Sequence, residues 1–145
     1  MSIQIQQAID SMREELQVDF IGIALSKVNT GTNLRTIHWQ YVAGNTNQNY
    51  KRIRLQVGKG IAGIVWRTGR SYCETNLQVD PTELVELPIA RMEKIETAVA
   101  APILKKGRVQ GVLLFGYRKP LEISDDFLRV VESRAEQLLA LLEET

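Results

Sequence analysis

The most informative segment of this chain reads Gly58-Lys59-Gly60-Ile61-Ala62-Gly63-Ile64-Val65-Trp66-Arg67-Thr68-Gly69-Arg70. In it, a glycine-spaced turn opens a short apolar helix near Ile61, and Gly69 ends that helix. The first N–H groups of such a helix have no partner within it, and its N-terminus carries a partial positive charge. The segment therefore predicts a corner where backbone amides attract a small anion, although glycine turns also precede helices that bind nothing.

Length and composition indicate one compact domain. The chain has 145 residues, of which 44% are hydrophobic, and we expect a single domain over residues 1–145. Lys and Arg number 18 against 17 Asp and Glu, so neither nucleic acid nor a membrane surface is favoured as a partner. No apolar run approaches the ~18 residues of a membrane span, and the first residues lack a secretory pattern. We therefore expect a cytoplasmic protein, and the single Cys73 agrees with a reducing compartment.

The first third of the chain predicts a helix followed by a β-hairpin. Apolar residues recur three or four apart over residues 3–18, which indicates an amphipathic helix. Alternation over residues 21–25 predicts the first strand, and residues 29–33 form a turn cluster. The second strand is expected to carry Ile37, Trp39 and Tyr41 on an inward face, and His38, Gln40 and Val42 on the other.

The remainder predicts more strands and a final helix. Residues 71–74 read as a short strand, and a helical or irregular crossing from Asp80, interrupted by Pro88, forms a lid. Residues 97–104 and 109–117 form the clearest hairpin and supply central strands. Ser124 caps a long amphipathic helix. The predicted fold class is α+β, with an antiparallel sheet flanked by helices and the terminal helices packed on one face.

Few residues could support metal or nucleophilic chemistry. His38 is the only histidine and Cys73 the only cysteine, which is too few for a zinc or iron site. His38 is interpreted as a strand-surface residue, and nothing in the spacing pairs it with Cys73 as a base. Trp66 is interpreted as a packing residue. Lys59, Arg67 and Arg70 lie on or beside a solvent-facing turn, so we expect them to be solvated rather than ligand-bound.

Four segments together carry a family resemblance: residues 19–25, residues 39–45, the glycine segment, and residues 109–117. They resemble a GAF domain over nearly the whole chain. More narrowly, Trp39, the turn at residues 44–47, residues 58–63 and Pro88-Ile89 resemble the NreA type, a stand-alone bacterial GAF protein. The resemblance implies a cytosolic nitrate receptor that modulates an oxygen-sensing histidine kinase. It implies no enzyme activity, cofactor or metal.

The same resemblance implies which residues hold the ion. The donors would be the main-chain N–H groups of Ile61 and Ala62 and the main chain around Leu87 and Ile89, with Trp39 closing the side. Nitrate spreads one charge over three oxygens, so neutral donors inside an apolar cage can hold it. In the family an aromatic residue often precedes the proline, whereas this chain has Leu87, so an aromatic contact from that position is lost.

Two alternatives stay open at this point. A GAF module could bind another small organic ligand and act as a homodimer through its terminal helices, and Asn45, Asn47 and Asn49 keep this possibility open, although such clusters usually form turns. An enzyme related to the free methionine sulfoxide reductases would need a second redox cysteine beside Cys73, which this chain lacks. The cyclic-nucleotide GAF signature cannot be aligned with this sequence, and bilin attachment to Cys73 is equally unsupported.

Overall fold

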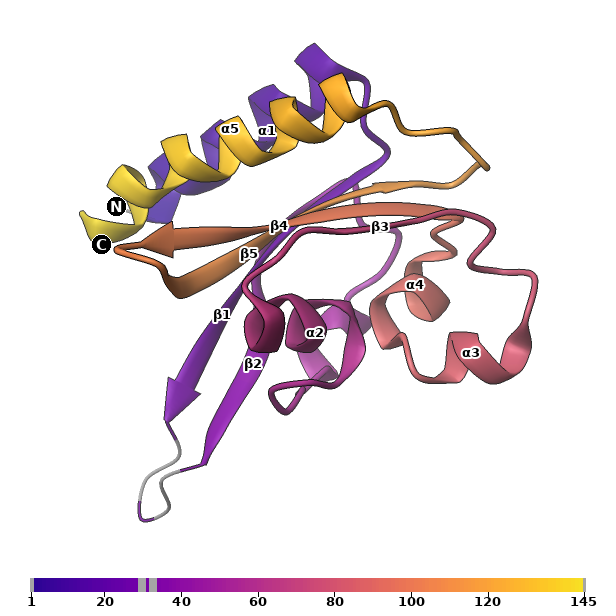
Figure 1. Ribbon diagram of the computed structural model, residues 1–145, viewed down its shortest axis with the longest axis horizontal. Coiled ribbons are helices and arrows are strands. Elements are labelled where there is room, and N and C mark those ends of the chain that lie inside the picture. The colour runs from indigo at the N-terminus through magenta and orange to yellow at the C-terminus, as the bar shows by residue number, and fades with distance from the viewer. Residues whose placement is uncertain (1, 29–30, 32–33, 145) are drawn as a thin grey trace.

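The computed structural model describes residues 2–28, 31 and 34–144, and it forms a sheet with helices on both faces (Figure 1). In chain order the elements are α1 (Ser2–Leu16), β1 (Phe20–Val28), β2 (Arg35–Ala43), the 3-10 helix η1 (Asn49–Arg52), α2 (Gly60–Thr68), β3 (Tyr72–Glu74), α3 (Pro81–Val85), α4 (Pro88–Glu93), β4 (Thr97–Lys105), β5 (Arg108–Tyr117) and α5 (Asp125–Glu143). The predicted α+β class is confirmed. The predicted turn at residues 29–33 lies, except for Gly31, outside the described residues.

The sheet has five strands in the order β2-β1-β5-β4-β3, and neighbouring strands are antiparallel. The predicted hairpin of β4 and β5 is confirmed, and both strands lie inside the sheet. Within the described part of the chain, no helix combines the length and the apolar character needed to cross a membrane.

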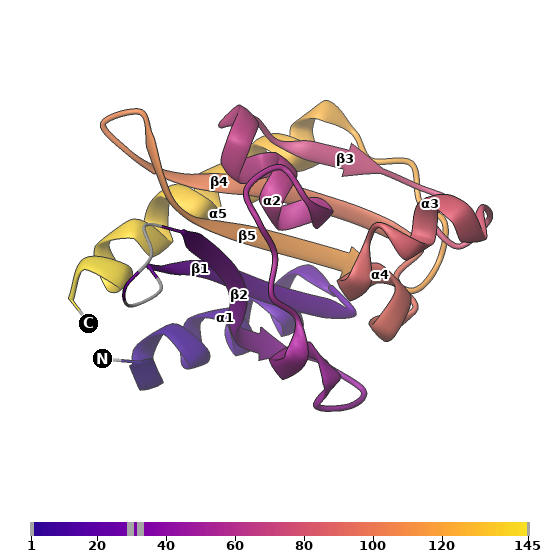
Figure 2. The same cartoon turned by 90° about the horizontal axis from the view of Figure 1, so that it is seen from below.

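The two faces of the sheet carry different helices. α1 and α5 lie side by side on one face, as predicted, and an ion pair of 2.8 Å joins Arg134 to Glu15 (Figure 1). Ser124 caps α5, because its Oγ accepts a hydrogen bond from Phe127 N at 3.1 Å. The shorter helices α2, α3 and α4 cover the opposite face (Figure 2). Each face therefore encloses its own buried apolar cluster.

A β-bulge in β2 corrects the predicted strand pattern. Ile23 pairs with Tyr41 and Ala24 with Trp39, so Gln40 is an extra residue in β2. An extra residue reverses the alternation beyond it. Trp39 and Val42 therefore both belong to the cluster under α2–α4, while Tyr41 packs on the opposite, terminal-helix face. The prediction that Trp39 points inward is confirmed, whereas the placement of Tyr41 beside it and of Val42 away from it was wrong.

His38 is also buried rather than at the surface, with 8% of its area exposed. The outer edge of β2 is covered, because Ile37 and Leu55 exchange two backbone hydrogen bonds of 2.8 and 2.9 Å. The His38 ring is hydrogen-bonded to Gln40 Oε1 at 2.7 Å. The pKa of His38 is lowered, because desolvation by burial outweighs the hydrogen bond to Gln40, which acts in the opposite direction.

Candidate functional site

The glycine segment folds back on the helix that it opens. Gly58 and Gly60 have φ angles of +94° and +68°, and a Cβ on Gly63 would lie 2.5 Å from the Gln56 carbonyl oxygen. Gly58 N donates to Gly63 O at 2.8 Å, and Lys59 N donates to Gln56 O at 3.0 Å. These two loop amides are therefore occupied, which leaves the helix start itself as the source of free donors.

The start of α2 is buried and has no side-chain cap. Lys59 is the N-cap residue, and its side chain makes no capping hydrogen bond. In an α-helix the N–H groups of the first turn have no intrahelical partner, and here that turn includes Ile61 and Ala62. Both residues are buried, with 1% and 0% of their area exposed. The positive end of the α2 dipole is thus embedded in apolar surroundings.

The start of α4 repeats this arrangement on the crossing segment. Leu87 is its N-cap residue and again provides no side-chain cap. Because Pro88 has no N–H, Ile89 carries the first free amide of this helix. Leu87 N is engaged, since it donates to Leu84 O at 3.0 Å. Of the main-chain donors expected around Leu87, only the N–H of Ile89 is therefore free. The side chain of Leu87 is apolar and buried.

Trp39 brings a third kind of donor to the same cluster. Its ring is 3% exposed, and its Nε1 is a buried atom without a hydrogen-bond partner. A Cβ on Gly22 would lie 2.9 Å from Trp39 Cε3, so the benzene ring of the indole packs closely against the Gly22 backbone. Gly22 was not identified from the sequence, because its role depends on the neighbouring strand.

The five residues expected to hold a ligand share one buried apolar cluster. It contains Trp39, Ile61, Ala62, Leu87 and Ile89. The side chains of Lys59, Arg67 and Arg70 are exposed, as predicted. The cluster therefore offers neutral N–H donors in apolar surroundings, a combination that suits a small anion with delocalised charge.

A buried carboxylate at the other end of α4 was missed in the sequence. Glu93 is 1% exposed, and its Oε1 accepts hydrogen bonds from Thr46 N at 2.8 Å and from Arg118 Nη2 at 2.7 Å. Arg118 Nη2 also donates to Gly44 O at 3.0 Å, so this network ties α4 to the turn that follows β2. Thr46 and Arg118 lie 47 and 25 residues from Glu93 in the chain, and no local pattern identifies them.

The side chains of the Asn-rich turn form hydrogen bonds within the turn. Asn45 Nδ2 donates to Asn47 O at 2.8 Å, and Asn47 Oδ1 accepts from Asn49 N at 2.8 Å. These side chains thus stabilise the turn, as Asn residues commonly do.

Cys73 and His38 cannot act together. They lie on β3 and β2, which form the two opposite edges of the five-stranded sheet. Burial raises the pKa of the Cys73 thiol and Glu74 adds to the effect, which disfavours the reactive thiolate. In the described residues no three His, Cys, Asp or Glu side chains gather where they could hold a metal ion.

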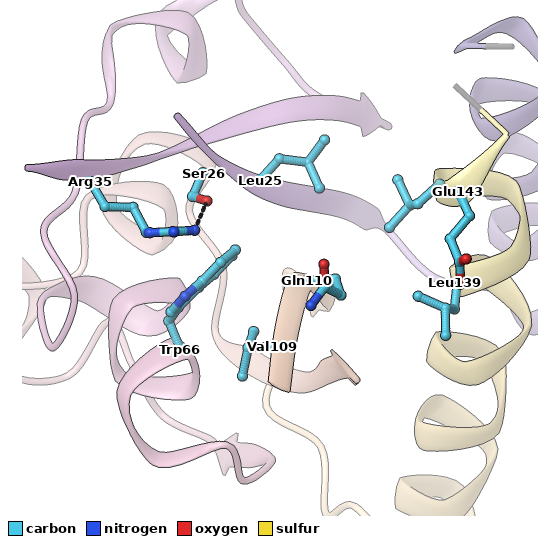
Figure 3. A pocket seen from close by; sticks show the side chains of 9 residues that line it. Leu25, Ser26, Arg35, Trp66, Val109, Gln110, Leu139 and Glu143 are labelled. Carbon is cyan, nitrogen blue, oxygen red and sulfur yellow. Dashed lines mark hydrogen bonds between the residues drawn. The ribbon is translucent and has the colours of Figure 1, made fainter. Parts of the chain in front are cut away.

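A separate open groove lies outside this cluster (Figure 3). Leu25, Trp66 and Leu139 are among the residues that line it, and none of the five expected site residues does. Trp66 is half-buried and packs against the α2–α4 cluster, which agrees with the packing role predicted for it.

Comparisons with known proteins show what this chain is similar to. A family model described as GAF domain matches residues 4–143. An NreA protein of Staphylococcus aureus, mutated in its nitrate binding site, is 36% identical, with 86% of this chain and 92% of that chain covered and a TM-score of 0.78. A hypothetical protein of S. aureus is 35% identical, with 83% and 99% covered and a TM-score of 0.75.

A third solved structure is similar to this chain in fold alone. A type II free methionine-R-sulfoxide reductase of Thermoplasma acidophilum is 15% identical, with 97% of this chain and 91% of that chain covered and a TM-score of 0.74. Among curated proteins, none matches the chain.

Proposed function

This chain belongs to the GAF domain family, and on that premise we propose that it is a cytoplasmic nitrate receptor that binds the ion without transforming it. Its similarity to NreA of S. aureus, a protein with a nitrate binding site, supports the choice of ligand. A single, free and exposed Cys73 supports a reducing compartment.

The observation that carries the proposal is the unpartnered Nε1 of Trp39. A buried donor without a partner costs about 1 to 3 kcal/mol, so it persists where a bound acceptor supplies the missing hydrogen bond. The same cluster holds the uncapped starts of α2 and α4, and these two helices contact each other. An anion between them would accept from Trp39 Nε1 and from the amides of Ile61, Ala62 and Ile89.

This donor set favours nitrate over a more strongly hydrated anion. The five residues expected to hold the ion offer only neutral N–H donors and apolar side chains, so a multiply charged ion such as sulfate would lose its hydration without receiving a counter-charge from them. Nitrate is planar and carries one charge, and Leu87, Ile61 and Ile89 provide the apolar walls of its cage.

Isothermal calorimetry against nitrate, nitrite, sulfate and cAMP tests the ligand. Nitrate should bind and should raise the melting temperature, because a ligand at ~100 times its dissociation constant adds about 2.7 kcal/mol to stability. Trp39→Phe removes Nε1 and should weaken nitrate binding at least about tenfold, which corresponds to ~1.4 kcal/mol. Trp66→Phe is the matched control and should bind nitrate as the unmodified protein does. Tighter binding of cAMP than of nitrate would contradict the proposal. So would a Trp39→Phe variant whose nitrate affinity is the same as that of the unmodified protein.

We further propose that the receptor modulates a sensor histidine kinase of a two-component system, as the resemblance to the NreA type implies. The test is the autophosphorylation rate of sensor histidine kinases from the same organism, measured with this protein in the presence and absence of nitrate. At least one kinase should respond to the protein, and its response should differ between the two conditions. Kinase activities that are the same with and without the protein would exclude this part of the proposal.

A further inference from the structure

The sheet splits at one end. The ladder between β1 and β5 stops at the pair Ala24 and Val112. Beyond it, β1 stays paired with β2 as far as Val28, and β5 stays paired with β4 from Arg108 onward. The facing edges of these two segments therefore leave backbone groups that are not paired with each other.

An open groove of about 370 Å3 lies at this split (Figure 3). Trp66 of α2 forms one wall and Leu139 of α5 the other, while Ser26 and Gln110 come from the two separated strands. A second hollow of about 510 Å3 continues it and shares Arg35, Trp66, Val109 and Gln110. Together they form one elongated groove, which we call the β1–β5 groove.

The β1–β5 groove changes character along its length. Arg35, Arg67 and Arg108 line the second hollow, and no acidic residue lines it. At the other end Leu25 and Leu139 are apolar, and the only acidic residue there, Glu143, is paired with Lys105 at 3.1 Å. One end is thus cationic, the other is apolar, and Trp66 stands where they meet.

The arginines of the cationic end are available for a partner. The ion pairs among the described residues involve Lys105, Arg118, Arg129 and Arg134 as cations. Within that part of the chain, Arg35, Arg67 and Arg108 have no carboxylate partner. Arg35 is held in place at the groove, since its Nη1 donates to Ser26 Oγ at 2.8 Å.

We propose that the β1–β5 groove binds an extended acidic segment of a partner protein. Its carboxylates would pair with the three arginines, and its apolar side chains would pack against Trp66, Leu25 and Leu139. Unpaired strand edges beside the groove supply main-chain hydrogen bonds, as in other modes of strand addition. Trp and Arg are the residue types most enriched where protein partners bind most strongly.

Shape and charge favour a peptide over other ligands. An elongated open groove encloses a small molecule poorly, whereas ligand pockets bury most of their ligand. A nucleic acid would require a wider basic surface than this chain offers, with 18 basic against 17 acidic side chains, and it would gain nothing from the apolar end. The groove lies outside the proposed nitrate site, so the two proposals can fail separately.

A panel of fluorescein-labelled nonapeptides tests the proposal. Each probe joins four or five Asp or Glu residues to a block of Leu and Phe, and its control carries Lys in place of the acidic residues. Anisotropy gives the affinity at low and at physiological salt. The emission of Trp66 gives the location, recorded with unlabelled peptides in a Trp39→Phe background, where Trp66 is the only tryptophan.

The protein variant is the triple substitution Arg35→Ala, Arg67→Ala and Arg108→Ala. Its matched control is Arg129→Ala, an exposed arginine on α5 that does not line the groove. We expect saturable binding of acidic peptides, a change in Trp66 emission, and at least about a tenfold loss in the triple variant, because several exposed ion pairs add up. An unchanged circular dichroism spectrum and melting temperature show that the triple variant is folded, and nitrate binding should also be unchanged in it.

Three results would overturn the proposal. They are absence of saturable binding by every acidic peptide, equal binding of the Lys controls, and equal affinity of the triple variant.

Discussion

Both faces of the sheet carry a buried apolar cluster, but they differ in how completely their polar groups are satisfied. Under α2–α4, Trp39 Nε1 and Glu93 Oε2 are buried without a partner, and α2 and α4 begin without side-chain caps. On the terminal-helix face, α5 is capped by Ser124, and neither of the unpartnered buried atoms found in the described residues lies there. Since an unsatisfied buried group costs about 1 to 3 kcal/mol, the contrast separates a stabilising face from the face that we propose to bind the ligand.

The largest expected effect comes from the stabilising face. Phe115→Ala should lower the free energy of unfolding by ~3 to 5 kcal/mol, because Phe115 is fully buried and contacts Phe127. The nitrate affinity of the folded molecules should stay the same. Urea unfolding and calorimetry, each at a temperature where the variant is folded, measure the two quantities. A folded Phe115→Ala variant with weaker nitrate binding would show that the two faces are not independent.

The second effect concerns the network that anchors α4. Glu93→Ala should cost about 3 kcal/mol of stability, because it removes the buried carboxylate that pairs with Arg118. It should also weaken nitrate binding, since the helix that carries Ile89 loses its attachment to the turn after β2. Glu93→Gln is the matched control, because its amide oxygen can still accept the hydrogen bonds made by Oε1. If Glu93→Ala were as stable as Glu93→Gln, the hydrogen bonds of Glu93 would not contribute to the stability of this face.

A smaller and more local effect is expected at Gly22. In Gly22→Ala, the new methyl group would press on Trp39 Cε3 at 2.9 Å, and overpacking of this kind typically costs 1 to 3 kcal/mol. We expect the indole to shift and nitrate affinity to fall by about tenfold, or ~1.4 kcal/mol. A double-mutant cycle with Trp39→Phe measures the coupling. Purely additive losses would mean that Gly22 does not position the ring.

The smallest effects should come from the exposed cations near the glycine segment. Lys59→Ala and Arg70→Ala should each change nitrate affinity by less than tenfold, because exposed charges contribute only ~0.2 to 1 kcal/mol. Nitrate titration at low and at physiological salt provides the measurement. Complete loss of nitrate binding in either folded variant would mean that a side-chain cation, and not the main-chain donors, holds the ion.

Much of the fold could be predicted because its elements follow local patterns. Apolar spacing identified the helices at both ends, and alternation identified the strands around Ile23 and Val112. Pro88 was expected to interrupt the crossing, and it does so by opening α4. The lid role of this crossing stays a prediction. The site was approached only through the family resemblance, since backbone donors leave no residue-specific pattern in a single sequence.

The missed features share a physical cause. The bulge at Gln40 depends on the register with β1, so Tyr41 was assigned to the wrong face. The burial of His38 depends on the segment around Leu55, which covers the edge of β2. In both cases the sequence of one strand does not contain the information, because a neighbouring segment decides it.

The sequence by itself determined the α+β class, the order of the elements, and the glycine segment that opens α2. These follow from backbone preferences and apolar periodicity, which act over a few residues. Only the tertiary structure decided that Trp39 Nε1 is left without a partner, that Glu93 meets Arg118, and that β1 and β5 separate beside Trp66. Burial, hydrogen-bond satisfaction and the meeting of distant charges are properties of the packed chain, and they arise only when segments far apart in sequence come into contact.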